Sequence, residues 1–189
     1  MEELKIFAKE NKKKIHDLLN HMWRTIERLH VRLEAIIPSP DLENAHGNFI
    51  KLQDGWDEAA YANPEIIFPY GEIGYSLDGL YCVYSLNPIK ITEKLLADIL
   101  VIINKNNELM LEIYGADDCF QTFYHSQEEM ALDETLASIR NTKEDLIQLE
   151  LSIEPLADED IKEAFVESII SLYDLFFQNN CLVKLPNYD

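Results

Sequence analysis

Aromatic and acidic side chains are concentrated between His46 and Tyr84, where five of the nine tyrosines lie within 24 residues. Tyrosine and tryptophan beside carboxylates suit a surface that binds cations through packing, cation–π contact and charge. Aromatic residues are also favoured in strands, where half of them face the core, so core packing explains the same composition. We predict a binding surface for a basic protein segment or a small cationic ligand, made by His46, Trp56, Asp57, Glu58, Tyr61, Tyr70 and Tyr81.

An enzyme acting on a small molecule is the alternative function, because a few side chains capable of acid–base catalysis are present. The sequence contains no glycine-rich phosphate loop, HExxH motif, serine elbow or EF-hand loop. Asp117 and Asp118 beside Cys119 oppose formation of a thiolate, so we predict no catalytic cysteine. We also expect no metal site and no cofactor. The acid–base residues of this alternative are His46, Asp57, Asp78 and His125.

A long N-terminal helix is predicted within residues 1–37, because apolar side chains recur in steps of four and three. The helix should end before Pro38. We favour packing of this seam on the sheet of the same domain, with a coiled-coil homodimer as the alternative. The chain is therefore expected to be a monomer or a homodimer. The seam consists of Ile15, Leu19, Met22, Ile26, Leu29, Leu33 and Ile36.

Residues 48–86 have no helical period and contain several turn signals, including Asp54-Gly55 and Asp78-Gly79. They predict an antiparallel meander of about four strands, with strands at residues 49–52, 71–75 and 80–84. Leu80, Cys82, Tyr84 and Leu86 should share one face of it.

Residues 92–178 are expected to mix helices and strands. Residues 92–104 fit a helix capped by Thr92 better than a buried strand, and residues 109–114 fit a strand. The pairs Cys119/Phe120 and Phe123/Tyr124 are four residues apart and predict helical turns. A capping box at residues 126–129 predicts a helix to about Arg140, residues 147–153 alternate as a strand, and residues 158–178 form the last helix.

The charge of the chain is strongly negative and unevenly distributed. Its 189 residues carry 35 acidic and 16 basic side chains, a formal net charge of −19. Residues 1–37 hold eight basic and six acidic side chains, net +2, so the remainder has a net charge of −21. An acidic body repels phosphate backbones and argues against nucleic-acid binding. The charge difference also favours docking of the N-terminal helix on its own domain.

A cytoplasmic location is expected from two further features of the sequence. The N-terminus lacks the apolar core of a signal peptide, and no uncharged apolar run approaches the 18 residues that span a bilayer, so no membrane association is predicted. Cys82, Cys119 and Cys181 are odd in number and widely spaced, which is typical of reduced thiols.

Glycines and aromatic residues recur at the predicted turns and strands of this chain. They lie in the segments Trp23, Asn48-Phe49-Ile50, Gly55-Trp56, Pro69-Tyr70-Gly71-Glu72-Ile73-Gly74, Asp78-Gly79-Leu80-Tyr81, Ile113-Tyr114-Gly115-Ala116, Phe120 and Phe123-Tyr124. Their order resembles a family of small, acidic, uncharacterised archaeal proteins, and the resemblance covers nearly the whole chain. It implies an α+β domain in an archaeal cytoplasm and no particular reaction.

We therefore predict one α+β domain spanning residues 1–189. An antiparallel sheet of five to seven strands should be covered on one face by the long N- and C-terminal helices, with the other face partly wet. The expected function is a binding or regulatory module without enzymatic activity.

Overall fold

The computed structural model describes residues 17, 21–36, 41–44, 64–75, 79–106, 108–115, 121–125, 131–143, 145–154 and 157–185. Within them, seven strands form one antiparallel sheet in the order β1-β2-β3-β4-β7-β5-β6. The strands are β1 (Asp41–Asn44), β2 (Pro64–Phe68), β3 (Gly71–Tyr75), β4 (Leu80–Leu86), β5 (Met110–Gly115), β6 (Gln121–His125) and β7 (Ile147–Ile153).

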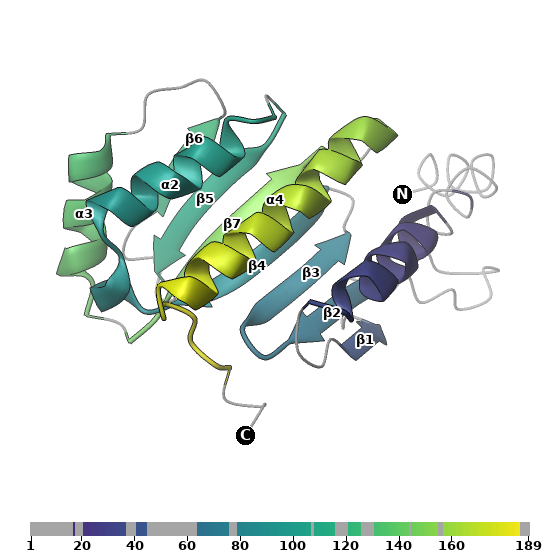
Figure 1. Cartoon of the computed structure of the whole chain (residues 1–189), viewed down its shortest axis with the longest axis horizontal. Helices are drawn as coiled ribbons and strands as arrows, with labels where there is room; N and C mark the ends of the chain where they lie inside the picture. Colours follow the sequence, from purple (N-terminus) through teal and green to yellow (C-terminus); the bar gives the residue numbers. More distant parts are fainter. Residues whose placement is uncertain are drawn as a thin grey trace, which may run out of the picture.

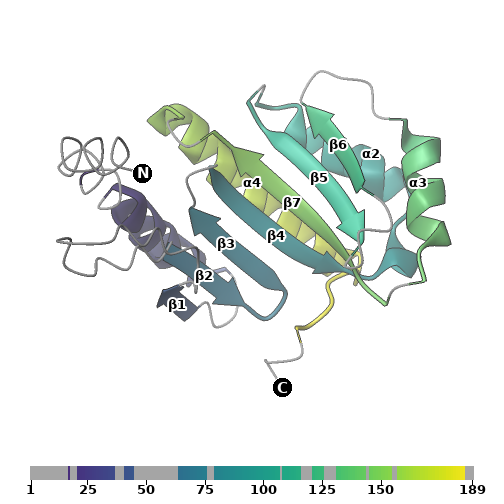
Figure 2. The ribbon, with the colours of Figure 1, turned by 180° about the vertical axis from the view of Figure 1, so that it is seen from behind.

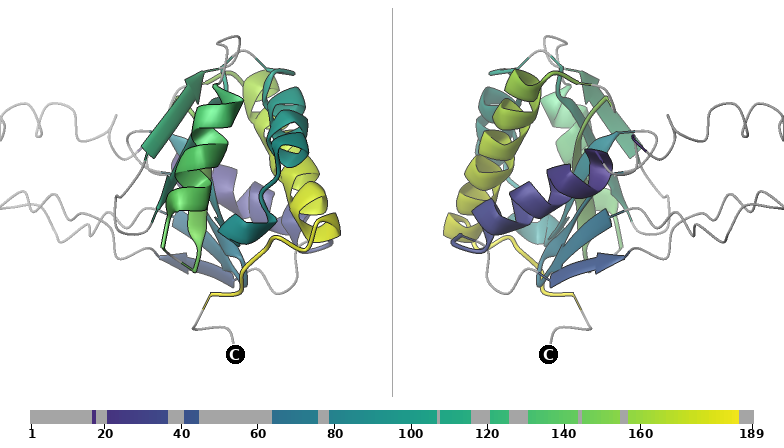
Figure 3. Two further views of the ribbon diagram at one scale, coloured as in Figure 1. Left: turned by 90° about the vertical axis from the view of Figure 1, so that its left-hand side faces the viewer. Right: turned by 90° about the vertical axis from the view of Figure 1, so that its right-hand side faces the viewer.

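Helices cover one face of this sheet (Figures 1 and 3). The N-terminal helix (residues 21–33) lies over β2, α2 (Glu93–Ile103) lies over β5, and α4 (Glu159–Gln178) lies over β4 and β7. The helix α3 (Leu132–Asn141) packs beside α2, and a short 3-10 helix, η1 (Pro88–Lys90), follows β4. The predicted α+β class and the one-sided helical cover are confirmed.

The N-terminal helix packs on its own chain. Met22, Ile26, Leu29 and Leu33 of the predicted seam are buried in the main hydrophobic cluster, whereas Ile36, in the turn after the helix, is exposed. Ion pairs add to this contact, because Arg28 and Arg32 reach glutamates of α4. The favoured interpretation of the seam is thus confirmed, and a coiled-coil dimer through the same four residues would require the helix to leave this core.

Five other predicted elements match the structure closely. The Thr92 side chain accepts a hydrogen bond from the Leu95 amide and caps α2, as expected. The strands β5 and β7 and the helix α4 lie where the apolar periodicity placed them. In β4, Leu80, Cys82, Tyr84 and Leu86 are all buried, and the Tyr84 hydroxyl donates to the Ile169 carbonyl of α4 over 2.7 Å.

The prediction of helical turns around Phe123 was wrong. Residues 121–125 form β6, which pairs antiparallel with β5 from Met110↔His125 to Tyr114↔Gln121. A spacing of four between aromatic residues fits a helix, but the open edge of β5 supplies backbone partners that a local pattern does not reveal.

The remaining differences concern the ends and number of elements. The helix α3 begins at Leu132 after Ala131, which makes no side-chain capping bond. The capping box at residues 126–129 and the strand expected at residues 49–52 lie outside the described residues. The short strands β1 and β2 were not predicted; they pair with each other and precede β3 and β4 in the described meander.

Candidate functional site: the open face of the sheet

The sheet has one face covered by helices and one face over which the described residues place no helix, here called the open face (Figure 2). Their difference follows from alternation along the strands. In β7, Ile147, Leu149, Leu151 and Ile153 are buried under the helices, whereas Gln148, Glu150 and Ser152 are half-buried on the other side. The same alternation in β5 places Glu112 and Tyr114 on the open face.

Strand register brings three glutamates of the open face into one row. Glu72 of β3 is opposite Val83 of β4, Val83 is opposite Glu150 of β7, and Glu150 is opposite Glu112 of β5. Directly opposed side chains have Cβ atoms about 4.5–5.5 Å apart, so Glu150 and Glu112 are neighbours. Glu72 lies two strands away from Glu150 on the other side of the small Val83 side chain.

Among the strand residues whose side chains the structure describes, all acidic ones, Glu72, Glu112 and Glu150, belong to this face. Backbone register places two further acidic positions of β1 and one of β2 on the same side as Glu72. None of the seven strands contains a lysine or an arginine. The acidic strand residues are Asp41, Glu43, Glu65, Glu72, Glu112 and Glu150.

Partial burial changes the acidity of this row. Burial and the neighbouring carboxylate of Glu112 raise the pKa of Glu150, and a hydrogen bond from the Tyr114 hydroxyl opposes that rise. Burial and the Glu150 carboxylate raise the pKa of Tyr114 far above its usual value. Tyr114 is therefore neutral and donates a hydrogen bond. Burial and the charge of Glu112 make ionisation of Glu150 less favourable, and a bound cation would offset that effect.

A second tyrosine lies next to the row. Gly74 and Tyr81 are opposite each other on β3 and β4, and a Cβ added to Gly74 would overlap the Tyr81 ring. The Tyr81 side chain therefore occupies the space over Gly74 that any larger residue at this position would fill. The open face thus presents aromatic surface beside carboxylates.

The structure places only part of the predicted binding surface. Tyr81 lies on the open face, whereas Tyr70, in the turn between β2 and β3, packs toward α4 with its ring 6.4 Å from that of Tyr173. These two tyrosines therefore do not share a face. The other members, His46, Trp56, Asp57, Glu58 and Tyr61, lie outside the described residues.

The acid–base residues of the enzyme alternative are not brought together by the described part of the chain. His125 is in β6, and His46, Asp57 and Asp78 lie outside the described residues, so this alternative stays a prediction. In the same part of the chain, no group of three or more His, Cys, Asp or Glu is arranged to hold a metal ion. None of the helices described is long and apolar enough to cross a bilayer.

Sequence reasoning missed the residues that form the acidic row, namely Glu72, Glu112, Glu150 and Tyr114. The alternation of β7 shows that Glu150 is on a wet face, but which glutamates of other strands become its neighbours depends on the pairing β4-β7-β5. Because that order is not the order of the sequence, spacing along the chain does not reveal it.

Comparison with known proteins assigns a family and no activity. Residues 17–167 match the family described as "Protein of unknown function (DUF3201)". The chain belongs to this family. As expected from the resemblance, the DUF3201 family is uncharacterised.

A solved structure supports the same fold for this DUF3201 chain. A conserved hypothetical protein from Pyrococcus furiosus, an archaeon, is similar with a TM-score of 0.60 and 24% sequence identity, over 89% of this chain and 98% of that one. Similarity at this level of identity shows the fold alone. No curated protein shows significant similarity to the chain.

Proposed function

We propose that the open face of the sheet binds a basic segment of another protein. The observation that carries this proposal is the segregation of charge within the sheet. Glu72, Glu112 and Glu150 are on one face, backbone register places the acidic positions of β1 and β2 on the same side, and the sequences of the seven strands contain no lysine or arginine. A face of one sign of charge attracts and orients a partner of the opposite sign.

The row of glutamates should also increase the affinity for a bound cationic group, beyond attracting it from a distance. Like charges directly opposed in a sheet are destabilising, and Glu150 and Glu112 are such a pair. A cationic side chain placed between them converts this repulsion into two favourable contacts. Partial burial of Glu150 strengthens these contacts because fewer water molecules screen them.

The tyrosines favour arginine over lysine in the partner. A guanidinium group binds carboxylates through two parallel hydrogen bonds and stacks on aromatic rings, whereas an ammonium group acts as a point charge. Tyr81 and Tyr114 lie on the same face as the glutamates and provide such rings. A protein segment with arginines on alternate positions matches the spacing of side chains along a strand.

The test is the binding of a fluorescent, arginine-rich peptide to the full chain, measured by anisotropy at low and high salt. We expect salt-sensitive binding that the triple variant Glu72→Gln, Glu112→Gln, Glu150→Gln weakens about tenfold, since three partly exposed ion pairs of about 0.5 kcal/mol each sum to that change. Binding of the peptide should also increase as pH rises through the raised pKa of Glu150.

A matched control separates a site from a general effect of charge. The variant Asp133→Asn, Glu134→Gln, Glu167→Gln removes the same number of charges from exposed positions of α3 and α4. It should leave peptide affinity within about twofold. Equal weakening by both variants contradicts the proposal. A third outcome is that spermidine displaces the peptide, whereas arginine-rich proteins of the same charge do not bind. That outcome would assign the face to a small cation instead of a protein segment.

A further inference from the structure

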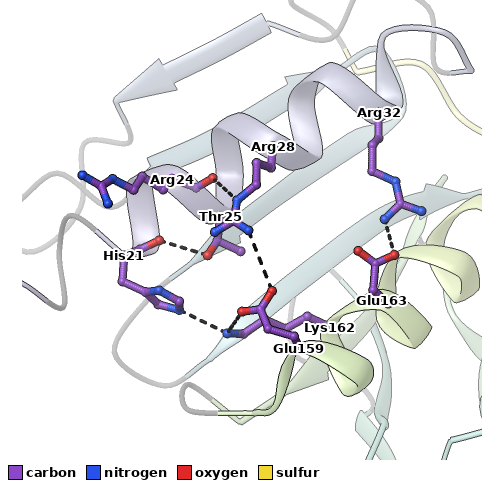
Figure 4. A network of polar contacts seen from close by, with 8 residues as sticks. All are labelled: His21, Arg24, Thr25, Arg28, Arg32, Glu159, Lys162 and Glu163. Carbon is purple, nitrogen blue, oxygen red and sulfur yellow. Dashed lines mark hydrogen bonds and ion pairs between the residues drawn. The ribbon is translucent and has the colours of Figure 1, made fainter.

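A polar network joins the N-terminal helix to the first turns of α4 (Figure 4). His21 Nε2 lies 3.1 Å from the Nζ atom of Lys162, and Lys162 donates a second hydrogen bond of 3.1 Å to Glu159 Oε1. Arg28 Nη1 is 3.9 Å from Glu159 Oε2, and Arg32 pairs with Glu163. The Lys162 side chain is 10% exposed, whereas the arginines and glutamates of the network are largely exposed.

The contact between His21 and Lys162 depends on the protonation state of the imidazole. An ammonium group has donors only, so His21 Nε2 accepts this bond and the ring is neutral with its proton on Nδ1. A protonated imidazole has two donors and no acceptor. Protonation therefore removes the hydrogen bond and leaves two positive charges about 3 Å apart at a largely buried position.

We propose that the His21–Lys162 contact is a pH-sensitive latch that releases the His21 end of the N-terminal helix from α4 on acidification. The proposal is independent of the function assigned to the open face, because this network lies on the helical side of the sheet.

All elements packed against His21 contribute to this balance. Lys162 and Glu159 face it from α4, Arg28 from its own helix, and the Tyr75 ring of β3 from the sheet, 6.2 Å away in an edge-on geometry. Burial and the positive charges of Lys162 and Arg28 lower the pKa of His21, and Glu159 opposes them without reversing the direction. Acidification therefore weakens the contact as pH falls below about 6.5, the ordinary value for histidine.

Hydrophobic packing limits how far the release extends. Ile26, Leu29 and Leu33 are almost completely buried and do not titrate. Arg32, near the Leu33 end of the helix, also pairs with Glu163 of α4. We therefore expect opening at the His21 end only, with the Leu33 end still docked.

The first test is the titration of His21 by NMR in the full chain. Its imidazole should titrate below pH 6.5, and Lys162→Met should move the midpoint upward because the buried positive charge is gone. A midpoint at or above 6.5 in the unmodified chain, or no upward shift in a folded Lys162→Met chain, overturns the proposal.

The second test measures release itself and does not depend on the lysine variant. Amide hydrogen exchange at residues 25–27, whose helical acceptors are the carbonyls of residues 21–23, should lose protection between pH 7.5 and 5.5 after correction for the intrinsic pH dependence, while residues 30–33 keep theirs. His21→Gln retains an acceptor for Lys162 and has no proton to gain, so its protection should stay constant over this range.

His30→Gln is the matched control, because His30 lies on the same helix and its Nδ1 atom is 3.7 Å from Glu34 in the turn that follows. It should lose protection at residues 25–27 as the unmodified chain does. Equal pH dependence in the His21→Gln chain, or loss of protection along the whole helix in the unmodified chain, contradicts the latch.

Discussion

Glu150 and Glu112 stand directly opposite each other on neighbouring strands, a pairing that a sheet selected for stability alone would avoid. Such local conflict is expected where a surface is built for a ligand, because binding residues are not optimised for the free protein. The Tyr114 hydroxyl reduces this conflict by donating to Glu150 and does not remove it, since the pKa of Glu150 stays raised.

Replacing Glu150 by glutamine should therefore stabilise the free protein. We expect Glu150→Gln to raise the free energy of unfolding at pH 7 by about 0.2–1 kcal/mol in urea denaturation, the range measured for cross-strand pairs. With a folded pKa above its ordinary 4.5, Glu150 lowers stability as pH rises through that pKa, and the glutamine variant should lack this decrease. A loss of more than about 1 kcal/mol would show that the carboxylate stabilises the native sheet.

The two described cysteines belong to the structure and not to a reactive site. Cys82 and Cys181 are both free and buried, and burial raises the pKa of Cys181 to about 11 and that of Cys82 further. A thiol that stays protonated and out of contact with water is a poor nucleophile. Among the described side chains, the functional candidates are therefore the carboxylates of the open face and His21.

At the scale of elements, apolar burial and charge both act on the N-terminal helix, with different weights. Ile26, on the side of the helix that faces the core, is fully buried, whereas Arg32 of the same helix pairs with Glu163 at the surface. Truncating a buried isoleucine to alanine costs about 2–5 kcal/mol, while an exposed ion pair contributes about 0.2–1 kcal/mol. The apolar seam therefore holds the helix in place, and the ion pairs orient it.

This difference predicts unequal effects of two substitutions on the same helix. Ile26→Ala should lower the free energy of unfolding by about 2–5 kcal/mol, and Arg32→Gln by less than about 1 kcal/mol, both measured in urea. High salt should abolish the effect of Arg32→Gln and leave that of Ile26→Ala unchanged. A larger loss for the arginine variant would mean that charge, and not burial, docks the helix.

Elements with a single buried face were predictable, and elements defined by their partners were not. The periodicity of α4 and the alternation of β7 reflect a simple division into buried and wet sides, which sequence records directly. The strand β6 adopts its conformation because it pairs with β5, and the four-residue strand β1 because it pairs with β2. The sequence of β1 carries little preference of its own, whereas Thr122, Phe123 and Tyr124 of β6 are of types favoured in strands, a signal that the four-residue spacing of the aromatic pairs obscured.

At the scale of the whole molecule, the net charge of −19 conceals an ordered distribution. Basic residues of the N-terminal helix meet glutamates of α4 on the helical side, and the strand acids collect on the opposite face. Partition of charge along the sequence predicted the first of these features. The second required the strand order, because glutamates 38 or more residues apart become neighbours only through the pairing of β5 and β7.

The most direct test of the central claim, that the open face is a binding surface for basic segments, is to map where such a segment binds. NMR spectra of the full chain labelled at glutamate and tyrosine side chains should be recorded while an arginine-rich peptide is added. The account predicts that the largest shifts occur at Glu72, Glu112, Glu150, Tyr81 and Tyr114. Shifts concentrated instead on the acidic residues of α3 and α4, with the sheet glutamates unchanged, would contradict it.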